Sequence, residues 1–308
     1  LNHQSRPDWH DRHFSRFKQL RPRVEQFTVQ LLNGLSIATI LILVSLGLAV
    51  IFGMLGIINL AHGEFFMLGA YCVATATSLG VSVWWGILMA PLVVGCVGII
   101  VQQTIIRRLY LRPLDTLLAT WGLSIVIRQI VRLFYGSGQM MTGSIISGST
   151  SIFGVNYPTY RLFIIAVTVL ILAATFYLYF RSDFGMRIRM VIANRAMAGA
   201  LGVNIEATDR WAFAIAAAMV GFAGAIMSPL IVINPEMGLE YLSRAFIVVI
   251  VGGIGHLYGV IAGGVAIGGS EAALSFFLRP VVAQVLVILF AVVLIRIRPQ
   301  GLTGNRNS

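Results

Sequence analysis

Long apolar stretches, separated by short polar or glycine-rich segments, run through almost the whole chain. They are found at 29–51, 57–79, 83–106, 114–135, 161–180, 211–233 and 281–295. All but the last reach the length of about 20 residues that an α-helix needs to cross a bilayer. The stretches are continuously apolar, whereas a membrane β-barrel would show segments of about 10 residues in which apolar and polar residues alternate. The pattern therefore predicts an all-α, polytopic membrane protein.

Glycines interrupt the apolar pattern once in each half of the chain. The first interruption lies around Gly63, and the second contains the expected helix breaks Gly252, Gly253 and Gly255. Because segment 244–298 has room for three short crossings, we expect about eight transmembrane helices, with glycine-broken segments in both halves. Paired interruptions in corresponding positions favour a solute pathway near the bilayer midplane. The alternative is that the glycines only permit close helix packing.

Composition agrees with a membrane protein, and the charge pattern orients it. Hydrophobic residues make up 58% and charged residues 11% of the 308 residues, whereas soluble domains carry about 25% charged residues. The net charge of +11 comes from arginines that gather in loops, which indicates the cytoplasmic side rather than a nucleic-acid partner. Segments 107–113 and 181–210 are therefore expected to be cytoplasmic. Segment 136–159 is uncharged, and segment 234–243 has no basic residue. Both are therefore expected to be external.

Residues 1–26 form a basic N-terminal extension, which we expect on the cytoplasmic membrane surface in contact with lipid head groups. Residues 27–302 form one transmembrane domain, and 303–308 form a C-terminal tail. Lys18 is the single lysine, and it lies in Phe-Lys-Gln rather than in the Gly-Lys-Ser/Thr of a nucleotide-binding P-loop. We therefore expect no nucleotide or other cofactor to be bound by this chain.

A histidine and a glutamate lie two residues apart inside the second apolar stretch. A charge in the middle of a bilayer costs about 3 kcal/mol, so such groups face protein or water and mark functional pathways. The spacing differs from the zinc motif His-Glu-x-x-His, which excludes a zinc protease of that type. No pairing of a serine with a histidine is readable either, so we expect no catalytic residue and no metal site. We expect Asn59, His62, Gly63 and Glu64 to line a translocation path, with Glu271 opposite. In the alternative, His62 only bonds a backbone carbonyl that the helix break exposes.

Other charged residues in apolar surroundings leave alternatives open. Arg128 and Arg132 lie four residues apart, and they either reach towards the membrane surface or pair with a neighbouring carboxylate. Glu64, His62 and Glu271 are also able to carry protons. In that case the chain would be an autonomous secondary transporter or channel.

The motif at 59–64, with Gly69 and Tyr71 after it, resembles a signature of the permease subunits of hydrophobic amino-acid ABC importers, the branched-chain amino-acid type. Asn234-Pro235 and the glycines at 252–255 are similar to the second-half signature. The sequences 185–204 and 298–302 resemble the cytoplasmic loop and the C-terminal motif of that family. The resemblance covers about 28–302.

The resemblance implies an assembly in the bacterial cytoplasmic (inner) membrane, with this chain as a multi-pass component. A second, related permease subunit would complete the membrane channel. Two cytoplasmic ATPase subunits would use ATP, and an extracytoplasmic binding protein would deliver the solute.

Within that assembly, segment 181–210 is expected to be the coupling loop. It is long enough for a short helix over 186–200, and Gly202 is a plausible stop. Contacts with the ATPase are expected from Arg187, Arg189, Asn194, Arg195 and Gly202. The alternative is a loop that only contacts lipid head groups.

The solute is less well defined. Branched-chain amino acids are what the family as a whole implies. The sequences 114–122 and 194–198, however, resemble the branch of the family that carries urea and short amides. On this basis we place urea or a short amide ahead of an amino acid.

Overall fold

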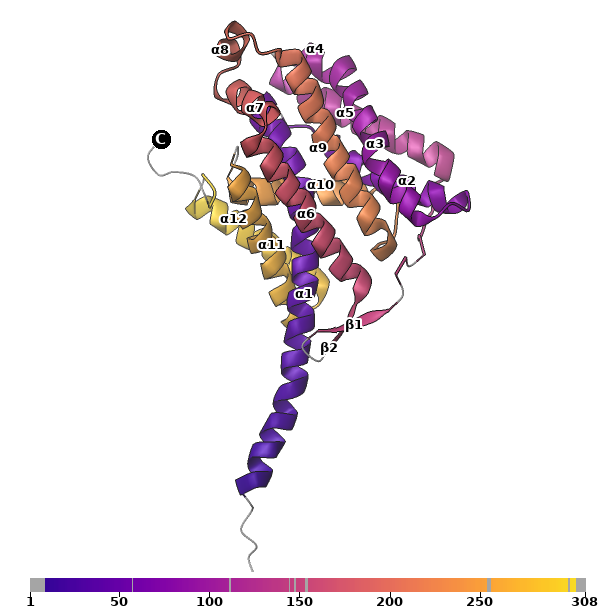
Figure 1. Ribbon diagram of the computed structural model, residues 1–308, viewed down its shortest axis with the longest axis vertical. Helices are drawn as coiled ribbons and strands as arrows, with labels where there is room; N and C mark the ends of the chain where they lie inside the picture. Colours follow the sequence, from indigo (N-terminus) through magenta and orange to yellow (C-terminus); the bar gives the residue numbers. More distant parts are fainter. Residues whose placement is uncertain are drawn as a thin grey trace, which may run out of the picture.

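The chain folds into a bundle of helices with one short hairpin (Figure 1). The computed structural model describes residues 9–56, 58–110, 112–143, 145–146, 148–152, 155–253, 256–298 and 300–302. The membrane-crossing part contains α1 (Trp9–Leu55), α2 (His62–Ser78), α3 (Val83–Val101), α5 (Pro113–Tyr135), α6 (Thr159–Arg181), α9 (Ile205–Met227), α10 (Met237–Gly252), α11 (Leu257–Phe277) and α12 (Pro280–Ile297). The connecting elements are η1 (Gln102–Ile106), α4 (Arg107–Leu109), β1 (Ser149–Ile152), β2 (Val155–Pro158), α7 (Asp183–Ala193), α8 (Arg195–Ala200) and η2 (Ser228–Leu230).

Among the described residues, six helical segments are long and apolar enough to cross a membrane. They are Thr28–Gly53, Val83–Leu109, Pro113–Tyr135, Thr159–Arg181, Ile205–Leu230 and Leu257–Phe277. With the shorter apolar helix Val281–Ile297 there are seven in the described ranges, roughly consistent with the eight expected. Helices α2 and α10 have 17 and 16 residues, about 25 Å at 1.5 Å per residue, less than the bilayer core of about 30 Å. Most residues of α2 are buried, and so are half of those of α10.

The two halves of the chain repeat the same order of elements in opposite directions. In each half a long helix (α1 or α9) is followed by a break, a short helix (α2 or α10) and a further apolar helix (α3 or α11). Helix α1 packs along α11, and α3 packs along α9. Figure 1 shows α1 and α9 starting at opposite ends of the bundle. This is the arrangement of an inverted repeat, which many transporters share.

The short helices begin with related sequences, Asn59-x-x-His62-Gly63 and Asn234-x-x-Met237-Gly238. Sequence reasoning paired the break at Gly63 with the glycines at 252–255. The structure pairs Gly63 with Gly238 instead, because each lies in the first turn of the short helix of its half.

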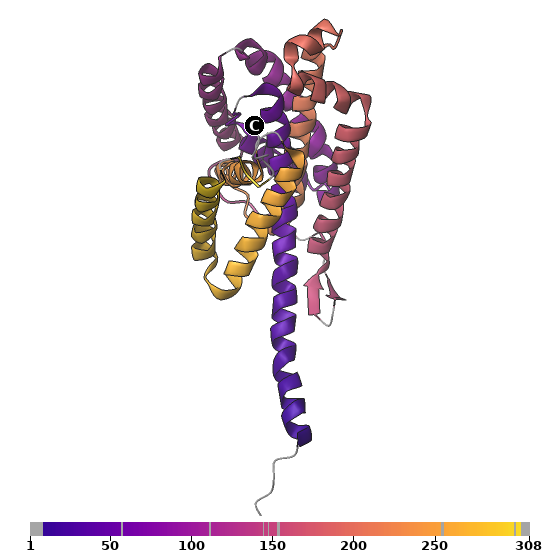
Figure 2. The same cartoon turned by 90° about the vertical axis from the view of Figure 1, so that its left-hand side faces the viewer.

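The N-terminal part of α1 projects beyond the bundle at the end that carries β1 and β2, away from α4, α7 and α8 (Figures 1 and 2). Residues 9–26 and 181–210 therefore lie on opposite sides, so the two cannot both be cytoplasmic. Five helices, α1, α2, α3, α5 and α6, lie between the two segments, so the predictions of a cytoplasmic extension and of a cytoplasmic segment 181–210 exclude each other. The predicted boundary at residue 26 falls inside one continuous helix.

Segment 136–159, expected to be an external loop, contains the hairpin. Strands β1 and β2 pair antiparallel, with Ser149 opposite Pro158. The Tyr157 hydroxyl donates to Asn33 Oδ1 of α1 at 3.1 Å. This bond fastens the hairpin to the first helix.

Candidate functional site

The turn that leads into α2 is built by Asn59. Its side-chain Oδ1 accepts a hydrogen bond from the Ala61 N–H at 3.0 Å, a local turn that asparagine favours. His62, fully buried, then places Nε2 3.2 Å from the Val44 carbonyl oxygen of α1. Nε2 donates to this oxygen in the tautomer that carries its proton there. His62 therefore ties the start of α2 to α1.

Helices α2 and α10 meet backbone to backbone at Gly63 and Gly238. A Cβ atom at Gly63 would overlap the Gly238 carbonyl, and one at Gly238 would lie 2.8 Å from the Gly63 carbonyl oxygen and from Glu64 Oε2. One turn further on, Phe66 stacks on Tyr241 with ring centroids 3.9 Å apart. At this crossing the first turns of the two short helices are in direct backbone contact.

Glu64 points from this crossing towards α5. The Ser124 hydroxyl donates to Glu64 Oε1 at 2.7 Å, and Arg128 Nε lies 3.3 Å from the same oxygen. The Glu64 side chain is 1% exposed, whereas that of Arg128 is 14% exposed. The buried carboxylate is therefore neutralised by a cation that approaches it from the outer side of the bundle.

The ion-pair network continues outward to the turn before α10. Arg128 Nη1 lies 2.9 Å from Glu236 Oε2, and Arg132 pairs with the other oxygen of Glu236. The Glu236 side chain is 48% exposed. Two carboxylates and two guanidinium groups thus form a charge-balanced row that leads from the buried Glu64 to the protein surface. We call this row, with Ser124, the Glu64 cluster.

Three polar atoms in the motif are buried without a hydrogen-bond partner among the described residues. They are Asn59 Nδ2, His62 Nδ1 and Glu64 Oε2. Because most buried polar groups in proteins are bonded, each exception calls for an explanation. All three lie within six residues, at the turn into α2 and in its first turn.

Glu271, expected opposite Glu64, takes part in a different network. Its Oε1 lies 3.4 Å from Arg244 Nη1, and Arg244 Nη2 lies 2.8 Å from Glu240 Oε1. These residues join α10 and α11, whereas Glu64 pairs with α5. The structure therefore assigns the two glutamates to separate clusters.

The glycines at the end of α10 support the C-terminal motif. Helix α10 ends at Gly252, and Gly253 has φ of +105°, a conformation that favours glycine. The Leu302 N–H donates to the Val251 carbonyl at 2.8 Å. Gly255 and Pro299 lie outside the described residues.

The expected coupling loop contains two helices rather than one over 186–200. Asn194 ends α7 and caps α8, since its Oδ1 accepts from the Met197 N–H at 2.9 Å. Gly202, with φ of +83°, lies in the turn after α8. Asn194 and Gly202 thus shape the segment.

The three arginines that were expected to contact the ATPase differ in their surroundings. Arg187 is exposed. Arg189 donates to the Tyr179 carbonyl and lies over the rings of Tyr179 and Phe180. Arg195 pairs with the buried Asp209 of α9. Of these side chains, that of Arg187 is the one directed to solvent.

Arg195 also lies over the ring of Tyr110, with 4.5 Å from its guanidinium carbon to the ring centroid. The Tyr110 hydroxyl accepts from Gln102 Nε2 at 2.9 Å. Burial, and next the charge of Asp209, raise the pKa of Tyr110, so the phenol stays protonated. These contacts join α8 to η1 and to α9.

Sequence reasoning did not assign Ser124, Arg128 and Glu236 to the site, although it considered that Arg128 pairs with a carboxylate. One signal was present, because Ser124, Arg128 and Arg132 are spaced four residues apart and share one helix face. Glu236 lies 108 residues further along the chain than Arg128, and no local pattern connects them.

Comparisons with known proteins show the family of the chain. The family model for the permease component of branched-chain amino acid transport systems matches residues 30–296. The chain is 29% identical to the high-affinity branched-chain amino acid transport system permease protein LivH of Salmonella typhimurium, over 91% of this chain and 96% of LivH. It is 28% identical to the corresponding permease protein BraD of Pseudomonas aeruginosa, over 92% of this chain and 98% of BraD. No solved structure matches the chain.

The inverted helical repeat and its buried charges define a polytopic membrane transport protein. The chain belongs to the family of permease components of branched-chain amino acid transport systems. Its relatives are transport subunits rather than enzymes.

Proposed function

We propose that this chain is one of two permease subunits that form the path of an ABC importer, and that its solute is a neutral amino acid with an aliphatic side chain. Separate ATPase subunits hydrolyse ATP, and an extracytoplasmic binding protein delivers the solute. The observation that carries the proposal is the Glu64 cluster, in which a charge-balanced row of ion pairs leads from the buried carboxylate of Glu64 to the protein surface.

The charges of this cluster favour a zwitterion over urea. An amino acid carries one ammonium and one carboxylate, and the cluster offers both carboxylates and guanidinium groups. Arginine binds carboxylates with paired hydrogen bonds. Urea is uncharged and would need no such costly groups within the membrane. The names of the relatives, which refer to branched-chain amino acids, support the same choice.

Transport is the direct test of the solute and of the energy source. In proteoliposomes that contain this chain, its partner permease, the ATPases and the binding protein, we expect leucine uptake that requires ATP. We expect urea to enter no faster than it does without ATP. Urea uptake driven by ATP would support the short-amide branch instead. Leucine uptake by the purified chain without ATP would indicate a secondary transporter.

The exposed residues of the expected coupling loop, segment 181–210, favour a docking surface for the ATPase. Met186, Arg187, Met197 and Leu201 are exposed at the end of the bundle that carries α7 and α8. A basic side chain among exposed apolar side chains suits a protein interface better than contact with head groups alone. Arg189 and Arg195, being engaged inside the chain, would act by holding this surface in shape.

Arg187→Glu is expected to lower the number of leucine molecules transported per ATP hydrolysed, because it reverses the charge of the basic side chain that lies among the exposed apolar ones. The measurement compares leucine uptake with phosphate release in the same proteoliposomes. Arg279→Glu, which changes an exposed arginine between α11 and α12, provides the matched control. An unchanged ratio in Arg187→Glu would show that this arginine serves only to orient the chain.

A further inference from the structure

We infer that a cavity between α10, α11 and α12 is a recognition site for the solute within this chain, built for a zwitterion with an aliphatic side chain. The inference rests on the proposed transport of such amino acids, and it adds a second site to the Glu64 cluster. The cavity has a volume of about 260 Å³. This is near the lower limit of about 300 Å³ for ligand pockets, so it suits a small molecule.

The polar end of the cavity is formed by Arg244 with Glu240 and Glu271. The guanidinium bonds one oxygen of each carboxylate, at 2.8 Å and 3.4 Å, while Arg244 Nε is buried without a partner among the described residues. A guanidinium has five N–H donors and binds carboxylates side-on through two of them. The free Nε–H thus offers a place for the carboxylate of a solute.

The same end offers a place for an ammonium group. Two carboxylates face one guanidinium, so negative charge is in excess here. Ser243 and Gln284, which also line the cavity, add neutral hydrogen-bonding groups. Glu271 lies within the candidate membrane span Leu257–Phe277, and ionisable groups inside such spans mark solute pathways by default.

The other end of the cavity is apolar. It is lined by Ile247, Ile267, Val287 and Ile288. Branched side chains of this kind fit the branched aliphatic side chain of a solute and gain about 25 cal/mol per Å² of apolar surface removed from water. A charged end and an aliphatic end in one cavity match a branched-chain amino acid, and they do not match urea.

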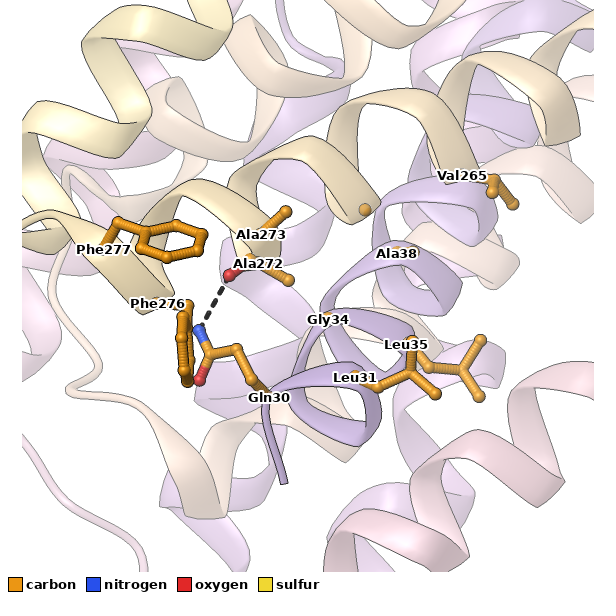
Figure 3. A pocket seen from close by; sticks show the side chains of 11 residues that line it. Gln30, Leu31, Gly34, Leu35, Ala38, Val265, Ala272, Ala273, Phe276 and Phe277 are labelled. Atoms are coloured by element: carbon orange, nitrogen blue, oxygen red, sulfur yellow. Dashed lines mark hydrogen bonds between the residues drawn. The ribbon is translucent and has the colours of Figure 1, made fainter. Parts of the chain in front are cut away.

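A larger cavity elsewhere in the chain has a different character. It lies between α1 and α11, with a volume of about 450 Å³ (Figure 3). Apart from Gln30, its lining residues are apolar or small, and the Gln30 amide already donates to the Ala272 carbonyl at 2.9 Å. No group there would hold an ammonium or a carboxylate. The cavity between α10, α11 and α12 is therefore the better candidate, despite its smaller volume.

The position of the cavity relates it to the Glu64 cluster. Glu236 of that cluster and Glu240 of the cavity lie one helical turn apart, at the beginning of α10. In Figure 2 the hairpin of α11 and α12 stands beside this helix. The two charged clusters thus lie next to each other at the beginning of α10.

Cysteine protection tests the site directly. In the assembled transporter, with Cys72 and Cys96 replaced by alanine, Ser243→Cys places a thiol at the exposed edge of the cavity. We expect leucine at about ten times its dissociation constant to slow labelling of this thiol by N-ethylmaleimide about tenfold, because an occupied site excludes the reagent. Leucinamide, which lacks the carboxylate, and urea should give no protection. Ser78→Cys, at the exposed end of α2, serves as the control and should be unaffected.

Substitutions of other cavity residues in the Ser243→Cys protein distinguish leucine bound in the cavity from an indirect loss of access to the thiol. Arg244→Gln should abolish protection by leucine, and Glu271→Gln should weaken it. Ile288→Phe, at the partly exposed wall of the cavity, should reduce protection by leucine more than protection by alanine. If the transporter carries leucine but the Ser243→Cys thiol remains unprotected, or stays protected in Arg244→Gln, the site is refuted and the proposed function stands. If the transporter carries urea and not leucine, the proposed function itself fails.

Discussion

Glu64→Gln is expected to reduce leucine uptake about tenfold or more without changing the amount of assembled transporter, a loss equivalent to about 1.4 kcal/mol in the transport barrier. Glutamine keeps the size of the side chain and accepts the hydrogen bond from the Ser124 hydroxyl. It removes the negative charge that Arg128 faces in the buried part of the site. Arg128 retains Glu236 as a partner, so folding should survive. Uptake is measured in proteoliposomes, and assembly by copurification with the ATPase.

Two further variants show whether the charge at position 64 is what matters. Ser124→Ala removes one hydrogen bond and keeps the charge, so it should give a smaller loss. Glu206→Gln makes the same chemical change in an exposed ion pair with Arg107 and should have little effect. Full uptake by Glu64→Gln would show that the carboxylate only holds the helix break in shape.

Gly63→Ala and Gly238→Ala are each expected to remove most of the folded protein from the membrane. An added methyl group at position 63 would overlap the carbonyl of Gly238, and a backbone atom cannot turn aside as a side chain can. Overpacking of a core typically costs about 1–3 kcal/mol and occasionally more. We expect the upper end of this range, because α2 and α10 would have to separate along their crossing. The yield of monodisperse protein after detergent extraction is the measurement.

Gly122→Ala is the matched control for these substitutions. A Cβ atom at Gly122 has no heavy atom within 4 Å, and alanine is a better helix former than glycine by about 1 kcal/mol. Its yield should equal or exceed that of the unchanged protein. Normal yields of Gly63→Ala would mean that the crossing is looser than the structure shows, and the pairing of the two halves at this point would have to be abandoned.

The helix positions were predictable because hydrophobicity is a local property. The apolar stretch 114–135 became α5 (Pro113–Tyr135), and 161–180 became α6 (Thr159–Arg181). The break between α7 and α8 was missed, although Asn194 carried a signal, since asparagine is a preferred helix N-cap. The sequence also placed the N-terminal extension and segment 181–210 on the same side of the membrane, and the structure contradicts that combination. Basic residues indicate the cytoplasmic side only on average, whereas the helices between two segments decide whether they share a side.

The candidate site was predictable only in part. His62 and Glu64 were recognised because buried polar groups are costly anywhere in a membrane. Their partners were not, because Val44, Ser124 and Arg128 come from other helices. Glu271 was recognised by the same rule and placed opposite Glu64, yet it pairs with Arg244 in a cavity of its own. The free-energy cost of burying a polar group identifies the residues that need a partner. It does not identify the residue that provides the partner.

The sequence by itself determined that this protein is a helical membrane protein, where its helices lie and which family it belongs to, because hydropathy and short motifs are readable along a single chain. Only the tertiary structure decided that Gly63 meets Gly238, that Glu64 joins Arg128 and Glu236, and that Arg244 forms a separate cavity with Glu240 and Glu271. The physical reason is that ion pairs and close backbone contacts depend on distances in space. The packing of α2 and α10 between the two halves sets these distances, and spacing along the chain does not.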